Sequence, residues 1–224
     1  MTKIALVTGG TGALGSAVVA QLLADGFTCH VTWVLPRELE HFPLGAQVTL
    51  HQTDCTDEAQ VQRLYAGLPQ LDASVHVVGG FGMATVGATT GAEFETMFRL
   101  NAVSAFLCTR EAISVMRRSK PGRIVNIAAR PALVPTGGMV AYSTSKAAVA
   151  SMTQCVAEEV RSEGILVNAI VPSTMDTPAN RASMLAADFS RWPKVEEVAH
   201  AIAFLVSERN ALTTGALVPV FGRS

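Results

Sequence analysis

The chain of 224 residues has few charged residues, few aromatic residues and no long uncharged apolar run. Charged residues make up 16% of it and aromatic residues 6%, and 17 basic against 18 acidic residues leave a formal net charge of −1. Because basic residues form no run, nothing favours a nucleic-acid partner. No uncharged apolar run approaches the roughly 20 residues that a helix needs to span a bilayer, so we expect no membrane partner.

The four cysteines, Cys29, Cys55, Cys108 and Cys155, show none of the spacings typical of a metal site. Several of them fall in expected strands or helices, so we expect reduced, mostly buried thiols, no bound metal and a cytoplasmic protein. An expected strand begins near the first residue, so we expect no signal peptide.

What the chain has is 49% hydrophobic residues and alternating strand and helix patterns, typical of a parallel sheet covered on both faces. Strands are expected at 3–8, 28–34, 48–53, 73–79, 123–129, 165–171 and 216–221. Helices are expected at 13–24, 57–67, 92–118, 140–162 and 194–207. These predict an α/β fold, with a single doubly wound, Rossmann-type sheet of about seven strands. We expect one catalytic domain over 1–224, with a substrate lid at about 172–193.

The N-terminal segment has the pattern of a dinucleotide-phosphate site. An apolar, β-rich run is followed at once by glycines and then by an amphipathic helix over 13–24. The glycines allow a tight turn and a close approach of the backbone to a pyrophosphate, and the helix N-terminus offers free N–H groups. The glycines concerned are Gly9, Gly10, Gly12 and Gly15.

Tyr142 and Lys146 lie four residues apart in the expected helix 140–162, so they share one face of it. A phenol has a pKa of about 10, which is high for acid–base chemistry at neutral pH. A nearby fixed cation favours the phenolate and lowers that pKa. The pair therefore indicates a general acid–base group with its activating cation.

Together, TGGTGALG, the Tyr142/Lys146 pair, Asn101 in RLNAVSAFLCT, GRIVNIA and VNAIVPSTMDTP resemble the short-chain dehydrogenase/reductase family over nearly the whole chain. The resemblance implies that Tyr142 is the acid–base group, that Lys146 lowers its pKa and binds the nicotinamide ribose, and that Asn101 holds a proton-relay water. It implies a cofactor site made by Gly9, Gly12, Leu14, Gly15, Trp33, Arg37, Asp54, Gly79, Lys146, Pro172 and Thr177. It implies a substrate pocket that includes Phe81, Ala129, Arg130 and Met175.

Three positions depart from the family pattern. Ala13 replaces the middle glycine of the turn, with Gly12 beside it, and we expect phosphate binding to be kept. Ala129 stands where the family has a serine that donates to the substrate oxygen, a kind of donor worth roughly 3 kcal/mol. The third position is His76, near the end of the expected strand 73–79. A lone histidine at the end of a buried strand is more often structural than catalytic.

These departures resemble the dihydropteridine reductase branch and its bacterial relatives, chiefly through AARPALVPTGGMVAYSTSKAAV, DTPANRASM and Gly79-Gly80-Phe81. The resemblance implies reduction of a pterin-like C=N group. Asn101 departs from that branch, so a small ketone or aldehyde stays open as substrate. A specific quinonoid dihydropteridine reductase is one alternative, and a catalytically silent dinucleotide-binding sensor or partner protein is another.

The coenzyme form depends on the end of the expected strand 28–34. An acidic residue there binds the ribose 2′-hydroxyl of NAD, but this chain has Trp33 and then Arg37. Arg37 predicts that NADP(H) is preferred over NAD(H), unless Trp33 packs on the adenine and Arg37 faces solvent. Asp54 matches an adenine-binding aspartate or, alternatively, caps the helix that starts near Asp57.

The family resemblance also implies a homodimer or homotetramer, in which the equivalents of helices 92–118 and 140–162 pair across a two-fold axis. Both helices are rich in small and apolar residues, which allow close helix packing on a second side. These residues include Ala102, Ala105, Ala147, Ala148 and Ala150.

Overall fold

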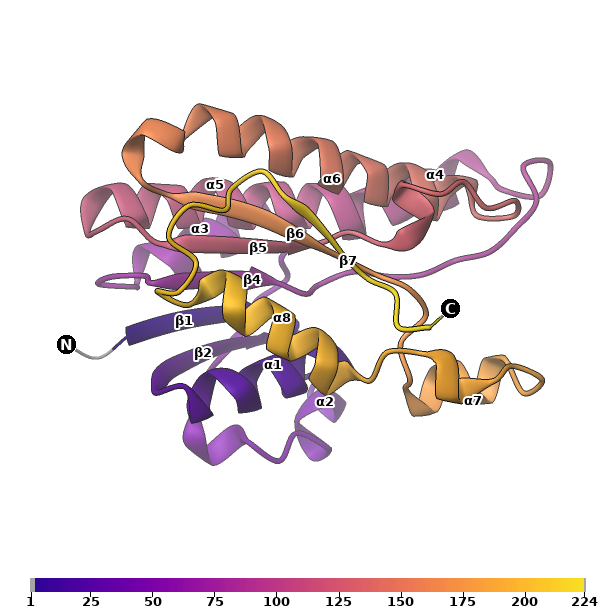
Figure 1. Ribbon diagram of the computed structural model, residues 1–224, viewed down its shortest axis with the longest axis horizontal. Helices are drawn as coiled ribbons and strands as arrows, with labels where there is room; N and C mark the ends of the chain where they lie inside the picture. The colour runs from indigo at the N-terminus through magenta and orange to yellow at the C-terminus, as the bar shows by residue number, and fades with distance from the viewer. Residues whose placement is uncertain (1–2, 224) are drawn as a thin grey trace.

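Seven parallel strands form one sheet in the computed structural model of the protein, which describes residues 3–223 (Figure 1). Their spatial order is β3-β2-β1-β4-β5-β6-β7, so the order reverses between β1 and β4. An open α/β sheet binds ligands at such a reversal, beyond the carboxyl ends of the strands. The strands are β1 (Lys3–Thr8), β2 (Phe27–Trp33), β3 (Thr49–Gln52), β4 (Ala73–His76), β5 (Arg123–Ile127), β6 (Leu166–Pro172) and β7 (Leu217–Val220).

Helices cover both faces of the sheet, which makes the fold the doubly wound, Rossmann-type sheet that the sequence predicts. One face carries α1 (Ala13–Ala24) and α8 (Val195–Val206), and the other carries α3 (Glu58–Ala66), α5 (Ser104–Arg118) and α6 (Val140–Glu159) (Figure 1). Three short helices lie in connections: α2 (Arg37–Glu40), α4 (Gly91–Phe98) and α7 (Pro178–Ser183).

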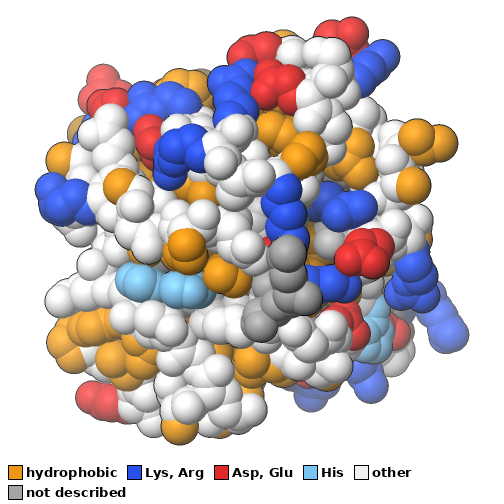
Figure 2. All heavy atoms as spheres, turned by 90° about the vertical axis from the view of Figure 1, so that its left-hand side faces the viewer, with side chains coloured by type: hydrophobic (Ala, Val, Ile, Leu, Met, Phe, Trp, Pro, Cys, Tyr) orange, Lys and Arg blue, Asp and Glu red, His pale blue; other side chains and the backbone are white. Residues whose placement is uncertain are grey.

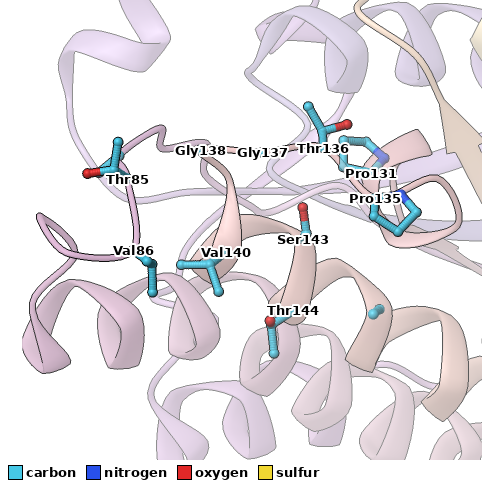
Figure 3. A pocket seen from close by; sticks show the side chains of 12 residues that line it. Thr85, Val86, Pro131, Pro135, Thr136, Gly137, Gly138, Val140, Ser143 and Thr144 are labelled. Atoms are coloured by element: carbon cyan, nitrogen blue, oxygen red, sulfur yellow. The ribbon is translucent and has the colours of Figure 1, made fainter.

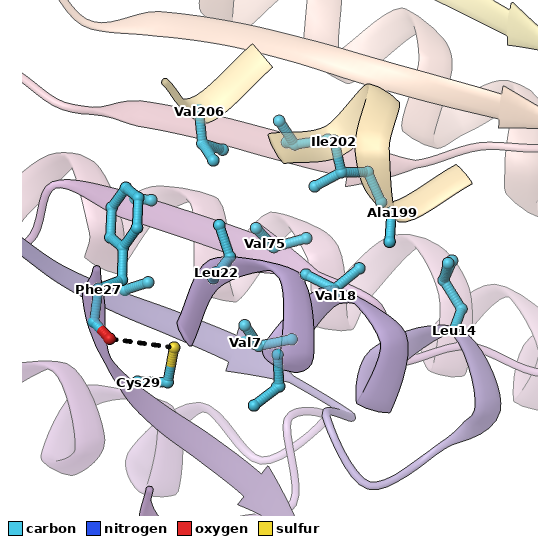
Figure 4. Packing of buried hydrophobic residues seen from close by; sticks show 14 of the residues in the cluster. Val7, Leu14, Val18, Leu22, Phe27, Cys29, Val75, Ala199, Ile202 and Val206 are labelled. Atoms are coloured by element: carbon cyan, nitrogen blue, oxygen red, sulfur yellow. Dashed lines mark hydrogen bonds between the residues drawn. The ribbon is translucent and has the colours of Figure 1, made fainter. Parts of the chain in front are cut away.

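The core has a separate apolar cluster on each face of the sheet. Figure 4 shows Val18 and Leu22 of α1 packed with Ile202 of α8 over Val7 and Val75 of the sheet, all fully buried. The opposite cluster gathers residues of α3, α5 and α6. Because both faces of the central strands are buried, the strands read as continuous apolar runs, which explains the high hydrophobic content.

Most predicted boundaries agree with the structure to within two residues, but some elements differ. Helix 140–162 was predicted three residues too long, because α6 ends at Glu159. Strand 73–79 was predicted too long: β4 ends at His76, and the next residues turn away at the carboxyl edge. Helix 92–118 was predicted as continuous, but a π-helical turn (Arg99–Val103) separates α4 from α5. Helices α2 and α7 were not predicted, because four and six residues are too few for a periodicity to be read.

The surface and the cysteines add two observations. On the face in Figure 2, at the amino ends of the strands, basic and acidic side chains are interspersed. Within residues 3–223, no helix is long and apolar enough to cross a bilayer. All four cysteines are free thiols, and three are buried, as the sequence predicts; Cys155 is exposed.

The glycine turn after β1 depends on backbone approaches that leave no room for side chains. Gly9 has a φ of +63°, a conformation that other residues rarely adopt. A Cβ at Gly15 would lie 2.2 Å from the Gly9 carbonyl oxygen, because α1 begins directly against the turn. Gly12 is different: it is exposed, and its Cβ would meet nothing closer than 3.5 Å.

Replacing Gly15 with alanine is therefore expected to force α1 away from the turn and to lower the free energy of unfolding by about 1–3 kcal/mol. Urea unfolding measures this change. Gly12→Ala is the matched control, since its φ of −74° suits alanine, and it is expected to change stability by less than about 1 kcal/mol. Equal stabilities for the two variants would contradict the proposed close packing.

Candidate active site

The residues of the predicted site converge at the carboxyl edge of the sheet, where the strand order reverses. The turn after β1 touches the segment after β4: a Cβ on Gly9 would lie 3.0 Å from the backbone nitrogen of Val78. Val77 also donates its N–H to the Thr8 carbonyl at 3.1 Å. The phosphate turn and the predicted catalytic groups are therefore built on directly contacting segments.

Helix α6 presents Tyr142 and Lys146 on one face, as the sequence predicts. Lys146 is 6% exposed, and its ammonium donates to the carbonyl oxygen of Ile127, the last residue of β5, at 2.8 Å. Tyr142 is half-buried, and Phe81 packs edge-on against its ring, with the ring centroids 5.0 Å apart. Lys146 is thus held to the sheet by a hydrogen bond, and the Tyr142 phenol packs against the ring of Phe81.

Burial dominates the titration of both groups. It raises the pKa of Tyr142 to about 12 and lowers the pKa of Lys146 to about 8. The pKa direction for Tyr142 is opposite to the one that the sequence predicts. The physical reason is that burial disfavours the charged phenolate, while the Lys146 ammonium donates its hydrogen bond to the Ile127 carbonyl. At neutral pH, Tyr142 is therefore a protonated phenol, suited to donate a proton.

Asn101 lies in the π-helical turn, is 1% exposed, and joins three parts of the site. Its Oδ1 accepts from the Gly80 N–H at 2.9 Å, and its Nδ2 donates to the Gly80 carbonyl at 3.1 Å. Nδ2 also donates to the hydroxyl of Ser145 at 3.0 Å, and that hydroxyl donates to the Tyr142 carbonyl at 2.7 Å. Asn101 therefore holds the loop after β4 against the catalytic helix.

Gly79 is the point on which these groups converge. A Cβ there would lie 2.5 Å from Asn101 Oδ1 and 3.2 Å from Lys146 Nζ, so any side chain would displace them. Gly79 is itself exposed, so the lysine and the asparagine lie directly behind an open stretch of backbone. This geometry suits a flat ring laid against Gly79, with Lys146 within reach.

The start of α1 fits a dinucleotide. No side chain caps the helix at Gly12, so its first N–H groups are free to bind a phosphate. Leu14 offers only its backbone, because its side chain is buried among α1 and α8. Pro172 ends β6 and is buried, and Thr177 caps α7 by accepting from the Asn180 N–H at 3.2 Å.

The residues predicted to lie beside the adenosine half of the coenzyme differ in burial and in hydrogen-bond partners. Trp33 ends β2 and is half-buried, whereas Arg37 is exposed at the start of α2. Asp54 does not cap α3, so that alternative was wrong. Its carboxylate accepts from the N–H and the hydroxyl of Thr56, each at 2.8 Å, and Asp57 is the cap.

The predicted substrate residues differ in exposure and in what they contact. Phe81 is 61% exposed, so its free face is open to a ligand. Ala129 is buried just beyond β5 and offers no donor. Arg130 is half-buried with its guanidinium 5.2 Å from the centre of the Phe221 ring, and Met175 packs partly against the cluster of α1 and α8.

The segment 172–193, predicted as a lid, is fastened at its base and open at its tip. The Asp176 N–H donates to the Pro193 carbonyl at 2.9 Å, and the Asp176 carboxylate binds Arg181 at 2.5 and 2.7 Å. At the tip, Met184 and Leu185 are 44% and 83% exposed. Any motion of the segment is therefore expected to involve its tip rather than its base.

His76 is not part of the site, which confirms the structural interpretation. It is 3% exposed, and both of its ring nitrogens have partners: Nδ1 lies 2.8 Å from Asn126 Oδ1, and Nε2 lies 2.8 Å from Ser74 Oγ. Burial lowers its pKa to about 4, so it stays neutral at physiological pH. Its role is to complete a buried hydrogen-bond network with Ser74 and Asn126.

Comparison with known proteins bears directly on this geometry. Residues 3–188 match the family described as "short chain dehydrogenase". The chain belongs to the short-chain dehydrogenase family. It is therefore an NAD(P)-dependent oxidoreductase.

Relatives match this family member over nearly its whole length. An acetoacetyl-CoA reductase of Allochromatium vinosum is 30% identical, with 99% of this chain and 98% of the relative covered. The 3-oxoacyl-[acyl-carrier-protein] reductase MabA of Mycobacterium tuberculosis is also 30% identical, with 99% and 92% covered. The structure titled "ElxO with NADP Bound" has a TM-score of 0.91 at 25% identity, covering 99% and 98% of the chains.

Ser145 and Glu38 are two site residues that the sequence analysis did not single out. Ser145 lies three residues after Tyr142 on the face of α6 that carries Lys146, and this spacing could have indicated it. Glu38 contacts the glycine turn through Thr11, whose hydroxyl donates to it at 2.7 Å. An acidic residue about 20 residues beyond a glycine turn was the signal available there.

A groove of about 560 Å³ lies on another side of α6 and does not include Tyr142 or Lys146 (Figure 3). Val140, Ser143 and Thr144 line it from the helix, facing the loops after β4 and β5 (Figure 3). The buried hydroxyl of Ser143 has no hydrogen-bond partner within the described chain. The groove is therefore separate from the acid–base pair.

The depressed pKa of Lys146 predicts how stability depends on pH. The folded-state pKa is about 8 and the ordinary value is 10.5, so the unfolded chain binds more protons between these two values. The contribution of Lys146 to the free energy of unfolding is therefore expected to rise with pH in that window, by about 2 kcal/mol from pH 8 to pH 10. Urea unfolding at a series of pH values measures it.

Lys146→Met supplies the reference for this measurement, because the other titrating groups, including Tyr142 and the buried thiols, are common to both proteins. The difference in unfolding free energy between wild type and variant should grow across the window. A difference that stays constant from pH 7 to pH 10 would show that Lys146 is not desolvated.

Proposed function

We propose that the protein is an NAD(P)H-dependent reductase of a small carbonyl or pterin-like C=N substrate, with Tyr142 as the general acid. The observation that carries the proposal is the convergence of Lys146 and Asn101 on the open backbone of Gly79, beside Tyr142 and the glycine turn. A nicotinamide held there would supply hydride to the substrate carbon. Tyr142 supplies the proton to the substrate oxygen or nitrogen, which completes the reduction.

The protonation states support the direction of proton transfer. A phenol with a pKa of about 12 holds its proton at neutral pH, so Tyr142 is ready to donate. Lys146 has a pKa of about 8 and is mostly protonated at pH 7, so its charge stabilises the phenolate that donation leaves. Ser145 and Asn101 then act as positioning residues, because they bind the backbone of Tyr142 and the loop that carries Gly79.

The substrate pocket favours a flat, largely apolar molecule. Phe81 and Met83 follow Gly79 along the chain, Leu133 and Val134 follow Ala129, and these four side chains are 61%, 62%, 43% and 47% exposed. Ala129 gives no hydrogen bond to a substrate oxygen, so a conjugated C=N group, which needs less help than a ketone, suits the site. This reasoning favours the specific quinonoid dihydropteridine reductase as the narrower form of the proposal.

The proposal also includes a substrate lid over the site, a homo-oligomeric assembly and a cytoplasmic location. The exposed tip at Met184 and Leu185 is placed to close over a bound substrate within one catalytic domain. NADP(H) in preference to NAD(H) follows only if the exposed Arg37 binds the 2′-phosphate. The free thiols fit the cytoplasm.

The catalytically silent sensor or partner protein is the competing function. Tight binding of a nicotinamide coenzyme without turnover of any ketone, aldehyde or quinonoid dihydropterin would favour it. Stopped-flow oxidation of NADH and NADPH with these substrates separates the two functions.

Tyr142→Phe is expected to lower turnover by about 10²–10⁴-fold, because the proton donor is lost while the ring that packs on Phe81 remains. Coenzyme affinity should change little. Ser143→Ala is the matched control, because Ser143 directly follows Tyr142 in α6. The hydroxyl that it removes has no hydrogen-bond partner within the described residues. Near-normal turnover in Tyr142→Phe, on a substrate verified with the wild type, would refute its assignment as the acid.

The homodimer proposed from the sequence uses the outer faces of α5 and α6. Ala102, Ala105 and Ala150 pack within the chain's own core, so they leave the interface to other residues. Phe106 and Val140 remain outward-facing, at 46% and 39% exposed. The dimer contact is therefore expected to centre on these side chains.

Light scattering at micromolar concentration is expected to give at least twice the 23.5 kDa of one chain. Phe106→Glu should shift the mass toward the monomer, because a charge cannot be buried unpaired in the contact. Leu212→Glu, at an 88% exposed leucine in the loop before β7, is the control and should leave the mass unchanged. A wild-type mass of one chain, with full activity, would rule out the dimer.

A further inference from the structure

A hydrogen-bonded carboxylate lies beside the glycine turn and is not used by the chemistry described above. The hydroxyl of Thr11, within the turn, donates to Glu38 Oε2 at 2.7 Å. Glu38 Oε1 accepts from the backbone N–H of Leu35 at 2.9 Å. Both oxygens are therefore held, and the carboxylate has a defined position next to the start of α1.

This carboxylate stands where the sugar of a bound dinucleotide would pass. In a unit of this kind, the pyrophosphate lies on the glycine turn and the adenosine ribose lies toward the end of the second strand. The turn is fastened to that strand, because the Gly9 N–H donates to the hydroxyl of Thr32 at 2.9 Å. Trp33, the last residue of β2, has no carboxylate. Glu38, in α2, places a carboxylate beside the glycine turn instead.

Arg37 lies differently from its neighbour. It is exposed, and its guanidinium has no hydrogen-bond or ion-pair partner within residues 3–223. Successive residues of a helix point about 100° apart, so the residue beside Glu38 is directed away from Thr11. Of the two adjacent charges, the negative one faces the turn and is fixed, whereas the positive one faces solvent.

The remaining capacity of Glu38 to accept hydrogen bonds matches a sugar and not a phosphate. A carboxylate accepts about four hydrogen bonds, and Thr11 and Leu35 supply two. The unused lone pairs suit the hydroxyl donors of a ribose. A 2′-phosphate offers mainly acceptors and negative charge, which a fixed carboxylate repels.

We propose that Glu38, held by Thr11, is the residue that selects the coenzyme, so that the protein binds NAD(H) in preference to NADP(H). The inference rests on the dinucleotide site of the proposed function and replaces the preference for NADP(H) that Arg37 suggested. Glu38 acts by accepting from the ribose 2′-hydroxyl and by excluding a phosphate from the same place.

Isothermal titration calorimetry of the full chain with NADH and with NADPH tests the proposal without any turnover. The wild type is expected to bind NADH at least about tenfold more tightly than NADPH. Glu38→Gln keeps the size of the side chain and removes its charge. It should narrow that ratio at least about tenfold, chiefly by tightening the binding of NADPH.

Arg37→Met is the matched control on the adjacent residue and should leave the ratio within about twofold. Tighter binding of NADPH by the wild type, an unchanged ratio in Glu38→Gln, or a large loss of NADPH affinity in Arg37→Met would each overturn the assignment. The wild-type comparison needs no variant, so it decides the preference even if Glu38→Gln fails to fold. Absence of binding of either coenzyme would instead overturn the proposed function itself.

Discussion

Backbone-to-backbone contact at the carboxyl edge of the sheet is the constraint on which the rest of the site depends. The turn after β1 and the segment after β4 approach so closely that a Cβ on Gly9 would lie 3.0 Å from the backbone nitrogen of Val78. At Gly79, the side chains of Asn101 and Lys146 leave no space for a side chain. Gly15 lets α1 begin directly against the same turn. These contacts bring the free N–H groups of α1 and the predicted catalytic residues to one edge of the sheet. A side chain at any of the three glycines would separate the phosphate site from the acid–base site.

The fixed position of Lys146 is the second constraint, and it has an energetic cost. Burial of an ammonium is unfavourable, and here the Ile127 carbonyl compensates only in part, since the pKa is still lowered to about 8. Burial likewise raises the pKa of Tyr142 to about 12 and keeps its proton in place. A partly hydrated site would lose both effects. The acid–base pair therefore depends on the packing around it as much as on its own spacing.

A network of hydrogen bonds transmits the position of one element to the next. Asn101 binds the backbone of Gly80 and the hydroxyl of Ser145, and Ser145 binds the backbone of Tyr142. The π-helical turn makes this possible, because the extra residue in the turn re-aims Asn101 between α4 and α5. Glu38 plays a comparable part at the other end of the crevice, where it joins α2 to the glycine turn.

The sequence by itself determined the fold class, most element boundaries and the family, because these depend on local patterns. Apolar runs followed by glycines located β1 and α1, and the four-residue spacing placed Tyr142 and Lys146 on one face of α6. Periodicity is a property of neighbours along the chain, so one sequence is enough to read it. The identities of Ala129 and Trp33 likewise showed that a hydroxyl donor and a carboxylate acceptor of the family pattern are missing.

Only the tertiary structure decided which groups meet and how strongly each is desolvated. The π turn at Asn101, the bond of Lys146 to Ile127 and the contact between Thr11 and Glu38 join residues from different elements. The pKa of Tyr142 shows the difference most clearly: spacing predicted a lowered value, whereas burial raises it. Desolvation depends on every atom packed around a group, and no local pattern in the sequence records that sum.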